Sequence, residues 1–420
     1  MAKHTHQSNI FEGCYGNHIL TSEVKRWLLD NLLDNMSRDI RITLNIWSAP
    51  GVGKTTLVKS LEKETVEWRH KKWDGFRIID IPLAQIEEMG DVLGFPVEEI
   101  KLESPDGKET WIKAVDTLIK AYLEKGFTTD GTQRTRYAPP AWVPTEECPG
   151  ILLFDDGNRA SQRIMKGLMQ LVQDYRTISW ELPKGWTIVF TGNPDNNINQ
   201  VTSMDAAQLS RMKHVTLKPD VQEWAKWAET QDDVDKRLIS FLLKNPEMMI
   251  AGERTNPRSL TEFGRALKRF PNLEEKQHED DYKRCYTEAY ASLDEDVVNS
   301  LMVFLVRDVA LVIEPETILT DIDRAIEQIK KLLNQAEPRL DILHITNSRL
   351  LAHLSAATDD PPRNQITNIQ KWLVESNMPQ DMVFAFIKSL WNNKMEFARK
   401  VFLTNDKLKK KVAEVLRTTF

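Results

Sequence analysis

Residues 48–55 read Ser-Ala-Pro-Gly-Val-Gly-Lys-Thr, a glycine-rich turn that ends in a lysine and a threonine. The apolar residues 42–47 before it are a predicted strand, and residues 57–64 after it are a predicted helix. The pattern GxxxxGK[ST] between a strand and a helix forms a loop whose backbone N–H groups hold phosphate oxygens. Ser48 stands where this pattern has its first glycine. The stretch predicts a phosphate loop within an α/β fold, and an ordinary glycine-rich turn is the alternative.

The residue types in this loop have separate tasks in binding a nucleoside triphosphate. Gly51 and Gly53 allow the backbone N–H groups to turn inward, and the helix that follows adds a positive dipole. We expect Lys54 to pair with the β- and γ-phosphates and the hydroxyl of Thr55 to bind Mg²⁺. The predicted ATP-binding residues are Pro50, Gly51, Val52, Gly53, Lys54, Thr55 and Thr56.

Two adjacent aspartates follow a second apolar run. Residues 150–154 read Gly-Ile-Leu-Leu-Phe and lead directly into Asp155 and Asp156. Such a run is typical of a strand that is buried on both faces and carries acidic groups to its carboxyl end. A phosphate loop needs an acidic strand end of this kind for Mg²⁺. We expect Asp155 to complete the Mg²⁺ site and Asp156 to polarise the attacking water; two solvated carboxylates in a turn are the alternative.

Strands and helices alternate over the first half of the chain, whereas the second half is almost wholly helical. Further strands are predicted at residues 76–81, 186–191 and 214–217, and helices at 22–37, 111–124 and 160–174. Residues 126–150, rich in Gly, Thr and Pro, are predicted as a long loop or hairpin. The alternation predicts a parallel sheet covered by helices on both faces. The expected domains are a large α/β domain (1–218), a helical lid (219–275) and a helical C-terminal extension (276–420).

Composition excludes several classes of protein. The net charge of −6 argues against a protein that coats nucleic acid generally. No apolar run approaches the roughly 18–20 residues needed to span a bilayer, and the N-terminus has no apolar signal region. The three cysteines are far apart and have no metal-ligand spacing. We therefore expect a cytoplasmic protein without a membrane span.

The order of these motifs resembles that of AAA+ ATPases. The stretches SAPGVGKT, GILLFDDGNRA, FTGNP and QLSRM follow one another as in that family, and GILLFDDGNRA in particular is similar to its MoxR branch of bacterial or phage type. The resemblance covers about residues 15–270. It implies ATP and Mg²⁺ as ligands, a nucleotide between the large domain and the lid, and a ring, most often of six subunits.

The resemblance also assigns roles to residues outside the loop. Asn193 in FTGNP matches a sensor residue that orients the water, and Arg211 in LSRM matches an arginine finger donated to the neighbouring subunit. Arg258, in NPRSL, matches a second sensor at the start of a lid helix, and Arg159 is a candidate for contact across the subunit interface. A turn asparagine and three surface arginines are the alternative for this set.

Two of these positions depart from the family pattern. Arg211 is flanked by serine and methionine, where the family usually has aspartate and phenylalanine. Asp156 stands where the family most often has glutamate, and its side chain is shorter by about 1.5 Å. A misplacement of about 1 Å can cost on the order of 10²-fold in rate. We therefore predict that ATP hydrolysis is catalysed, but slowly.

The function implied by the resemblance is ATP-driven remodelling or assembly of a protein client. MoxR-like proteins act as chaperone-like motors and commonly work with a partner that carries a von Willebrand A domain. Two alternatives remain: an ATPase that acts on nucleic acid through the basic and aromatic residues 68–73 or the lysines of 407–411, and a nucleotide-gated scaffold with little turnover.

Overall fold

The computed structural model describes residues 13–195, 201–273 and 279–410. Residues 196–200, which lie between the FTGNP and QLSRM motifs, are outside the described residues. The chain divides into two compact units, Met1–Lys218 and Pro219–Phe420. The second unit is helical, as expected. Its division at residue 275 into a lid and an extension stays a prediction.

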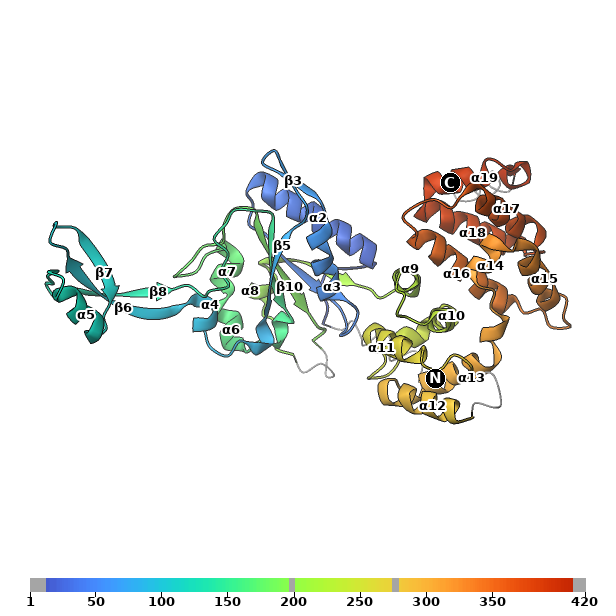
Figure 1. Ribbon diagram of the computed structural model, residues 1–420, viewed down its shortest axis with the longest axis horizontal. Coiled ribbons are helices and arrows are strands. Elements are labelled where there is room, and N and C mark those ends of the chain that lie inside the picture. The colour runs from blue at the N-terminus through green and yellow to red at the C-terminus, as the bar shows by residue number, and fades with distance from the viewer. Residues whose placement is uncertain (1–12, 196–200, 274–278, 411–420) are drawn as a thin grey trace. The chain divides into compact units, whose positions relative to one another are not determined.

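A six-stranded sheet, in which every neighbouring pair is parallel, forms the centre of the first unit (Figure 1). The strand order is β1-β11-β2-β10-β9-β5. The strands are β1 (Asn17–Ile19), β2 (Thr43–Trp47), β5 (Arg77–Pro82), β9 (Gly150–Asp155), β10 (Trp186–Gly192) and β11 (Met212–Leu217). The predicted α/β fold with a parallel sheet is confirmed; the short edge strand β1 was not predicted.

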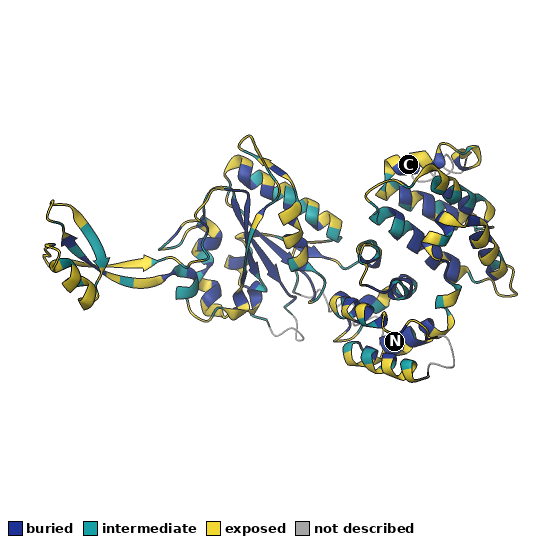
Figure 2. Cartoon of the chain, in the orientation of Figure 1, coloured by how far each residue is buried: buried dark blue, intermediate teal, exposed yellow. Residues whose placement is uncertain are grey.

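Helices cover both faces of this sheet, which is why its central strands are buried along almost their whole length. On one face, Ile151 and Leu153 pack with α2 (Thr21–Arg38) and α3 (Lys54–Lys59). On the other, Leu152 and Phe154 pack with α6 (Gln162–Gly167) and α7 (Met169–Asp174). Successive residues of a strand point to opposite faces, so β9 buries every side chain up to Phe154. Figure 2 shows these strands buried.

An antiparallel sheet is inserted between β5 and β9, and the sequence did not predict it. Its strands are β6 (Phe95–Glu103), β7 (Glu109–Lys113) and β8 (Gln133–Ala138), in the order β7-β6-β8. The predicted helix 111–124 is wrong over its first residues, which end β7; only α5 (Asp116–Leu123) is helical. None of the eight residues of α5 is buried (Figure 2). The predicted loop 126–150 contains β8.

Several short elements complete the first unit. β3 (Val66–Trp68) and β4 (Lys71–Trp73) form a hairpin whose turn residues Arg69 and His70 have positive φ. The other helices of this unit are α4 (Gly90–Leu93) and α8 (Ala206–Leu209). Single 3-10 turns lie at Ser60–Lys63, Leu83–Gln85 and Gly157–Arg159.

The second unit has one continuous apolar core that runs from Val221 to Leu408. Its helices are α9 (Val221–Glu229), α10 (Lys236–Lys244), α11 (Pro257–Leu267), α12 (Glu279–Ser292), α13 (Glu295–Arg307), α14 (Pro315–Thr320), α15 (Ile322–Leu333), α16 (Leu340–Ala356), α17 (Arg363–Glu375), α18 (Gln380–Asn393) and α19 (Met395–Phe402). Among the described residues of this unit, 3-10 turns lie at Pro246–Ile250 and Val309–Leu311. Across the described residues, no helix combines the length and apolar character required to cross a membrane.

A buried arginine joins three parts of this second unit. Arg349 of α16, with a side chain only 1% exposed, donates to the Glu314 carboxylate at 2.6 Å and to Glu229 Oε1 at 3.3 Å. Glu229 ends α9 and its side chain is 3% exposed. A buried carboxylate that loses its cation keeps the full cost of desolvation. The guanidinium therefore holds α9 and the segment before α14 against α16.

We expect Arg349→Met to lower the free energy of unfolding by about 3–5 kcal/mol, because it leaves the buried Glu229 with only the more distant Lys236 and His353 beside it. Urea unfolding followed by circular dichroism measures the change. Lys331→Met is the matched control, since Lys331 pairs with Glu327 on the exposed surface of α15, and its loss should cost less than about 1 kcal/mol. A loss below about 1 kcal/mol for Arg349→Met would contradict the proposed clamp.

Candidate functional site

The glycine-rich loop joins β2 to α3, as predicted. Gly51 and Gly53 have φ values of 76° and 101°, in the left-handed region. Gly53 is the N-cap of α3, directly before its first residue Lys54, and a Cβ atom there would meet no heavy atom within 4 Å. Backbone conformation, and not lack of space, is therefore the reason for glycine at this position. The first N–H groups of a helix have no acceptor within the helix, so a turn of this kind directly before α3 suits an anion.

Lys54 is buried inside this loop and surrounded by oxygen atoms. The residue as a whole is only 6% exposed. Its Nζ donates to the carbonyl oxygens of Ser48 at 2.9 Å and Ala49 at 3.2 Å, and to Oδ1 of Asn193 at 2.9 Å. A buried ammonium is costly unless it is well hydrogen-bonded. Neutral oxygens meet that need here, and phosphate oxygens would meet it with added Coulomb attraction.

Asp155 receives hydrogen bonds from two hydroxyl groups. Thr55 Oγ1 donates to Asp155 Oδ1 at 2.7 Å, and Thr191 Oγ1 donates to the same oxygen at 2.6 Å. A hydroxyl and a carboxylate are the hard oxygen ligands that Mg²⁺ prefers, and Mg²⁺ usually takes only one or two carboxylates beside phosphate and water oxygens. The donor set of Thr55 and Asp155 therefore fits Mg²⁺ bound together with a nucleotide.

Asp156 adopts a left-handed backbone conformation, with φ 49° and ψ 43°. Its N–H donates to Thr191 Oγ1 at 2.9 Å, and its Oδ1 accepts from Asn193 Nδ2 at 2.9 Å. Arg159 Nε lies 3.5 Å from Oδ2. Among residues with a side chain beyond Cβ, aspartate and asparagine tolerate this conformation best. The bend after β9 thus gives a physical reason for aspartate, where the resemblance leads one to expect glutamate.

Asn193 is held in place by a second asparagine that the sequence did not single out. Asn158 Nδ2 donates to the carbonyl oxygen of Asn193 at 2.6 Å, and the N–H of Asn193 donates to Asn158 Oδ1 at 3.0 Å. Both residues are 1% exposed. The amide of Asn158 therefore pairs with the Asn193 backbone as a neighbouring strand would. The sequence shows only an asparagine directly after Asp155-Asp156-Gly157, and its burial and its partner become visible in the structure alone.

The structure brings five of the predicted residues together: Lys54, Thr55, Asp155, Asp156 and Asn193. Arg211 lies elsewhere on the same unit. It is exposed, and its guanidinium donates to Gln173 Oε1 at 2.8 Å and to the Ala207 carbonyl at 2.5 Å. It precedes Met212, which pairs with Thr43 at the start of β2, whereas the loop follows Trp47 at the end of β2. Arg211 therefore lies at the amino end of β2, and the loop lies at its carboxyl end.

Arg258 belongs to the second unit, where it is the second residue of α11 and is exposed. Its N–H donates to Asn256 Oδ1 at 3.0 Å, which closes the first turn of that helix. Its sensor role stays a prediction. Arg159 is also largely exposed, with 43% of its side chain accessible.

The basic hairpin β3–β4, a candidate nucleic-acid contact, does not present a continuous positive surface. Arg69 forms an ion pair with Glu147 and lies over the Trp68 ring at 4.3 Å, while Lys71 lies over the Trp73 ring at 4.2 Å. Arg77, beside the hairpin in sequence, pairs with Glu146. Glu147 and Glu146 thus offset the charges of Arg69 and Arg77, and repulsion from these two carboxylates weakens phosphate binding.

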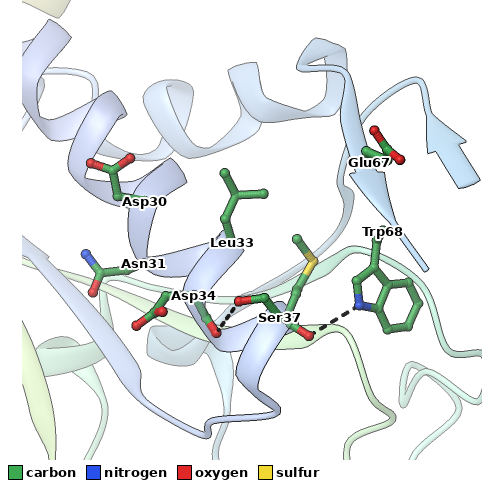
Figure 3. A pocket seen from close by; sticks show the side chains of 8 residues that line it. Asp30, Asn31, Leu33, Asp34, Ser37, Glu67 and Trp68 are labelled. Carbon is green, nitrogen blue, oxygen red and sulfur yellow. Dashed lines mark hydrogen bonds between the residues drawn. The ribbon is translucent and has the colours of Figure 1, made fainter. Parts of the chain in front are cut away.

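An open pocket of about 530 Å³ lies between α2 and the hairpin (Figure 3). Trp68 Nε1 donates to the Met36 carbonyl at 3.4 Å at its edge. Its lining residues are Asp30, Asn31, Leu33, Asp34, Met36, Ser37, Glu67 and Trp68. None of them is among the residues predicted to bind the nucleotide, and three carboxylates make the pocket unsuited to an anionic ligand.

Comparison with known proteins gives limited information. No protein-family model matches the chain, and no curated protein matches it. Similar solved structures include the Holliday junction branch migration motor RuvB of Thermotoga maritima (16% identity, 74% of this chain and 76% of that one, TM-score 0.33). Others are Cdc6p of Pyrobaculum aerophilum (11%, 91% and 89%, 0.34) and NtrX of Brucella abortus (12%, 78% and 72%, 0.32). TM-scores this low carry no argument, so the fold rests on the strand order and register of the sheet.

A histidine supports the strand end from which the loop departs. Trp47 Nε1 donates to His214 Nδ1 at 3.0 Å, so the other nitrogen, Nε2, carries the proton that bonds to the Leu209 carbonyl at 2.8 Å. Burial lowers the pKa of His214 below its usual value of 6.5. Protonation of Nδ1 would remove the acceptor that Trp47 uses.

We expect acid to weaken the first unit through His214. The pKa of His214 is lower in the folded protein than in the unfolded chain, so folding favours the neutral imidazole. The contribution of neutral His214 to stability is complete above about pH 6.5. It is lost as the pH falls through the pKa of the folded protein. The free energy of unfolding, measured between pH 7.5 and 5.5, should fall more steeply for the wild type than for His214→Gln. Equal slopes would show that His214 does not carry this pH dependence.

Proposed function

We propose that the chain is a AAA+ ATPase of the MoxR-like type, which binds ATP with Mg²⁺ and slowly hydrolyses it to ADP and phosphate in order to remodel or assemble a protein client. The observation that carries the proposal is one connected hydrogen-bond network at a single edge of the parallel sheet. It links the phosphate-loop residues Lys54 and Thr55 to Asp155 and to the pair Asp156 and Asn193. These are the groups that phosphoryl transfer to water requires.

Each side chain has a distinct task in the proposed reaction. Lys54 would bind the β- and γ-phosphates in place of its present neutral oxygen partners, and Thr55 and Asp155 would hold Mg²⁺. When bound, Mg²⁺ neutralises charge on the phosphate oxygens. Asp156 would accept a hydrogen bond from the attacking water on its carboxylate, whose Oδ1 is bonded to Asn193 Nδ2 and whose Oδ2 lies 3.5 Å from Arg159 Nε. Asn193 thus fixes the carboxylate that orients the water.

The position of Arg211 supports an oligomer. It lies one strand length, roughly 15 Å, from the phosphate loop of its own chain, so it is poorly placed to act there. An exposed arginine at that edge suits the nucleotide of a neighbouring subunit, where an arginine finger contributes about 10³–10⁵ in rate. A ring of six is the arrangement implied by the family resemblance. We further propose that a von Willebrand A-domain partner supplies the client and that the complex acts in the cytoplasm of a bacterial cell or of a phage-infected host.

The nucleic-acid alternative has less support. Two cations of this region, Arg69 in the hairpin and Arg77 beside it, are paired with glutamates, and the net charge of the chain is −6. ATPase activity that rises with DNA and falls steeply with salt would favour this alternative over a protein client.

We expect Lys54→Ala to weaken ATP binding by about 10–100-fold, since it removes a charge-assisted contact to the phosphates worth about 1.5–3 kcal/mol. Binding is measured by the fluorescence of a labelled ATP analogue. Lys59→Ala is the matched control, because Lys59 is on the same helix but pairs with Asp80. Equal affinities for the two variants would contradict the assignment of the loop.

We expect Asp156→Asn to retain ATP binding and to lower single-turnover hydrolysis by about 10²–10⁴-fold, the usual range for loss of a general base. Rapid-quench analysis of labelled ATP measures the rate. Hydrolysis at the wild-type rate would show that Asp156 does not act on the water.

A subunit-mixing experiment tests the trans role of Arg211. Rings of Arg211→Ala alone and rings of Lys54→Ala alone should each be nearly inactive. A mixture of the two variants should regain activity, because some interfaces then combine an intact phosphate loop with an intact Arg211. Steady-state phosphate release measures the recovery. No recovery in mixed rings, verified by size-exclusion chromatography, would place Arg211 outside the site.

A further inference from the structure

Thr191 is a buried hydroxyl that contacts both aspartates at once. It lies in β10, two residues before Asn193, and is 0% exposed. Its Oγ1 donates to Asp155 Oδ1 at 2.6 Å and accepts the N–H of Asp156 at 2.9 Å. A hydroxyl has one donor and two acceptor sites. Because its single hydrogen is directed at Asp155 and a lone pair at Asp156, this one group has a defined orientation toward both residues.

We propose that Thr191 is a positioning residue for the Mg²⁺ site and for the water-orienting carboxylate. The terminal torsion of an aspartate is broad and roughly two-fold, so its two oxygens exchange readily unless contacts distinguish them. At Asp155 the hydroxyls of Thr55 and Thr191 both donate to Oδ1. These two bonds distinguish the two oxygens and fix the orientation of the carboxylate beside Thr55. The proposal rests on the ATPase function proposed above.

The second contact of Thr191 acts on the backbone. The N–H of Asp156 belongs to the left-handed residue that ends β9. By accepting this N–H, Thr191 Oγ1 holds the bend that carries the Asp156 carboxylate to Asn193 Nδ2. Loss of the hydroxyl therefore affects both the metal ligand and the water-orienting group. Groups that orient a metal ligand typically contribute 10–100-fold to metal affinity or activity.

The same strand offers a matched control. Thr187 is also in β10 and 0% exposed, and its Oγ1 accepts from Asn35 Nδ2 at 3.2 Å. Thr187 lies at the opposite end of the strand from Thr191, at the second residue of β10. A threonine-to-valine change at either position keeps a branched side chain and removes one buried hydroxyl. Only the change at Thr191 should affect Mg²⁺.

The test compares Thr191→Val, Thr191→Ser and Thr187→Val in the full chain. Binding of Mn²⁺ in the presence of a saturating, slowly hydrolysed ATP analogue is followed by EPR, and ATP binding without a metal is measured by fluorescence. We expect Thr191→Val to weaken Mn²⁺ binding by about 10–100-fold and to leave metal-free ATP binding within about 2-fold. Thr191→Ser, which keeps the hydroxyl, and Thr187→Val should both stay near the wild type.

The outcomes separate this inference from the function on which it rests. A wild-type protein that binds neither ATP nor Mn²⁺ with the analogue would overturn the proposed ATPase function. A wild-type protein that binds both, with a Thr191→Val variant of unchanged Mn²⁺ affinity, would overturn the role of Thr191 alone. If Thr191→Val does not fold, the comparison of Thr191→Ala with Thr191→Ser decides: equal Mn²⁺ affinity in that pair contradicts the role, and loss confined to alanine supports it.

Discussion

The candidate site depends on the parallel register of β9 against β10 and of β10 against β2. Phe190 pairs with Phe154 on one side and with Asn45 on the other. Asp155 and Thr191 each follow directly after one of these phenylalanines, so they are neighbours on one face of the sheet. It is the face on which α3 packs through Leu57 and Val58. Thr55, at the start of α3, therefore meets the same carboxylate.

This register also explains why the network tolerates little error. Side chains of a strand alternate between faces, so a slip of one residue would turn Thr191 toward the opposite face and remove it from Asp155. The apolar residues of the three strands prevent such a slip, because each face is buried under its own helices. The free energy that holds the polar network in place thus comes largely from apolar burial beneath it.

The sequence was sufficient to predict those parts of the site in which a residue type and its strand or helix context specify a task. Lys54, Thr55 and Asp155 follow from a glycine-rich turn and from an acidic strand end. Thr191 and Asn158 do not, since a polar residue at a strand end has meaning only when the neighbouring strand and its register are known. The left-handed conformation of Asp156 is likewise a consequence of how β9 turns, which no local pattern encodes.

The inserted sheet was missed for a different reason. Residues 111–124 contain apolar residues at helical spacing, and this signal is real for α5, but the first three residues pair with β6. A strand of five residues gives too short an alternation to compete with the helical spacing that follows it. β8 was hidden similarly, because its residues Gln133–Tyr137 are all exposed and show no apolar alternation.

The separation of Arg211 from the phosphate loop links assembly to catalysis in the proposed ATPase. A single chain carries the groups that bind phosphate and water at one edge of its sheet and the proposed finger at the other. Contacts between unlike surfaces close into a ring when the rotation between subunits allows it. In such a ring every interface would complete one site, and the short carboxylate of Asp156 would make each turnover slow.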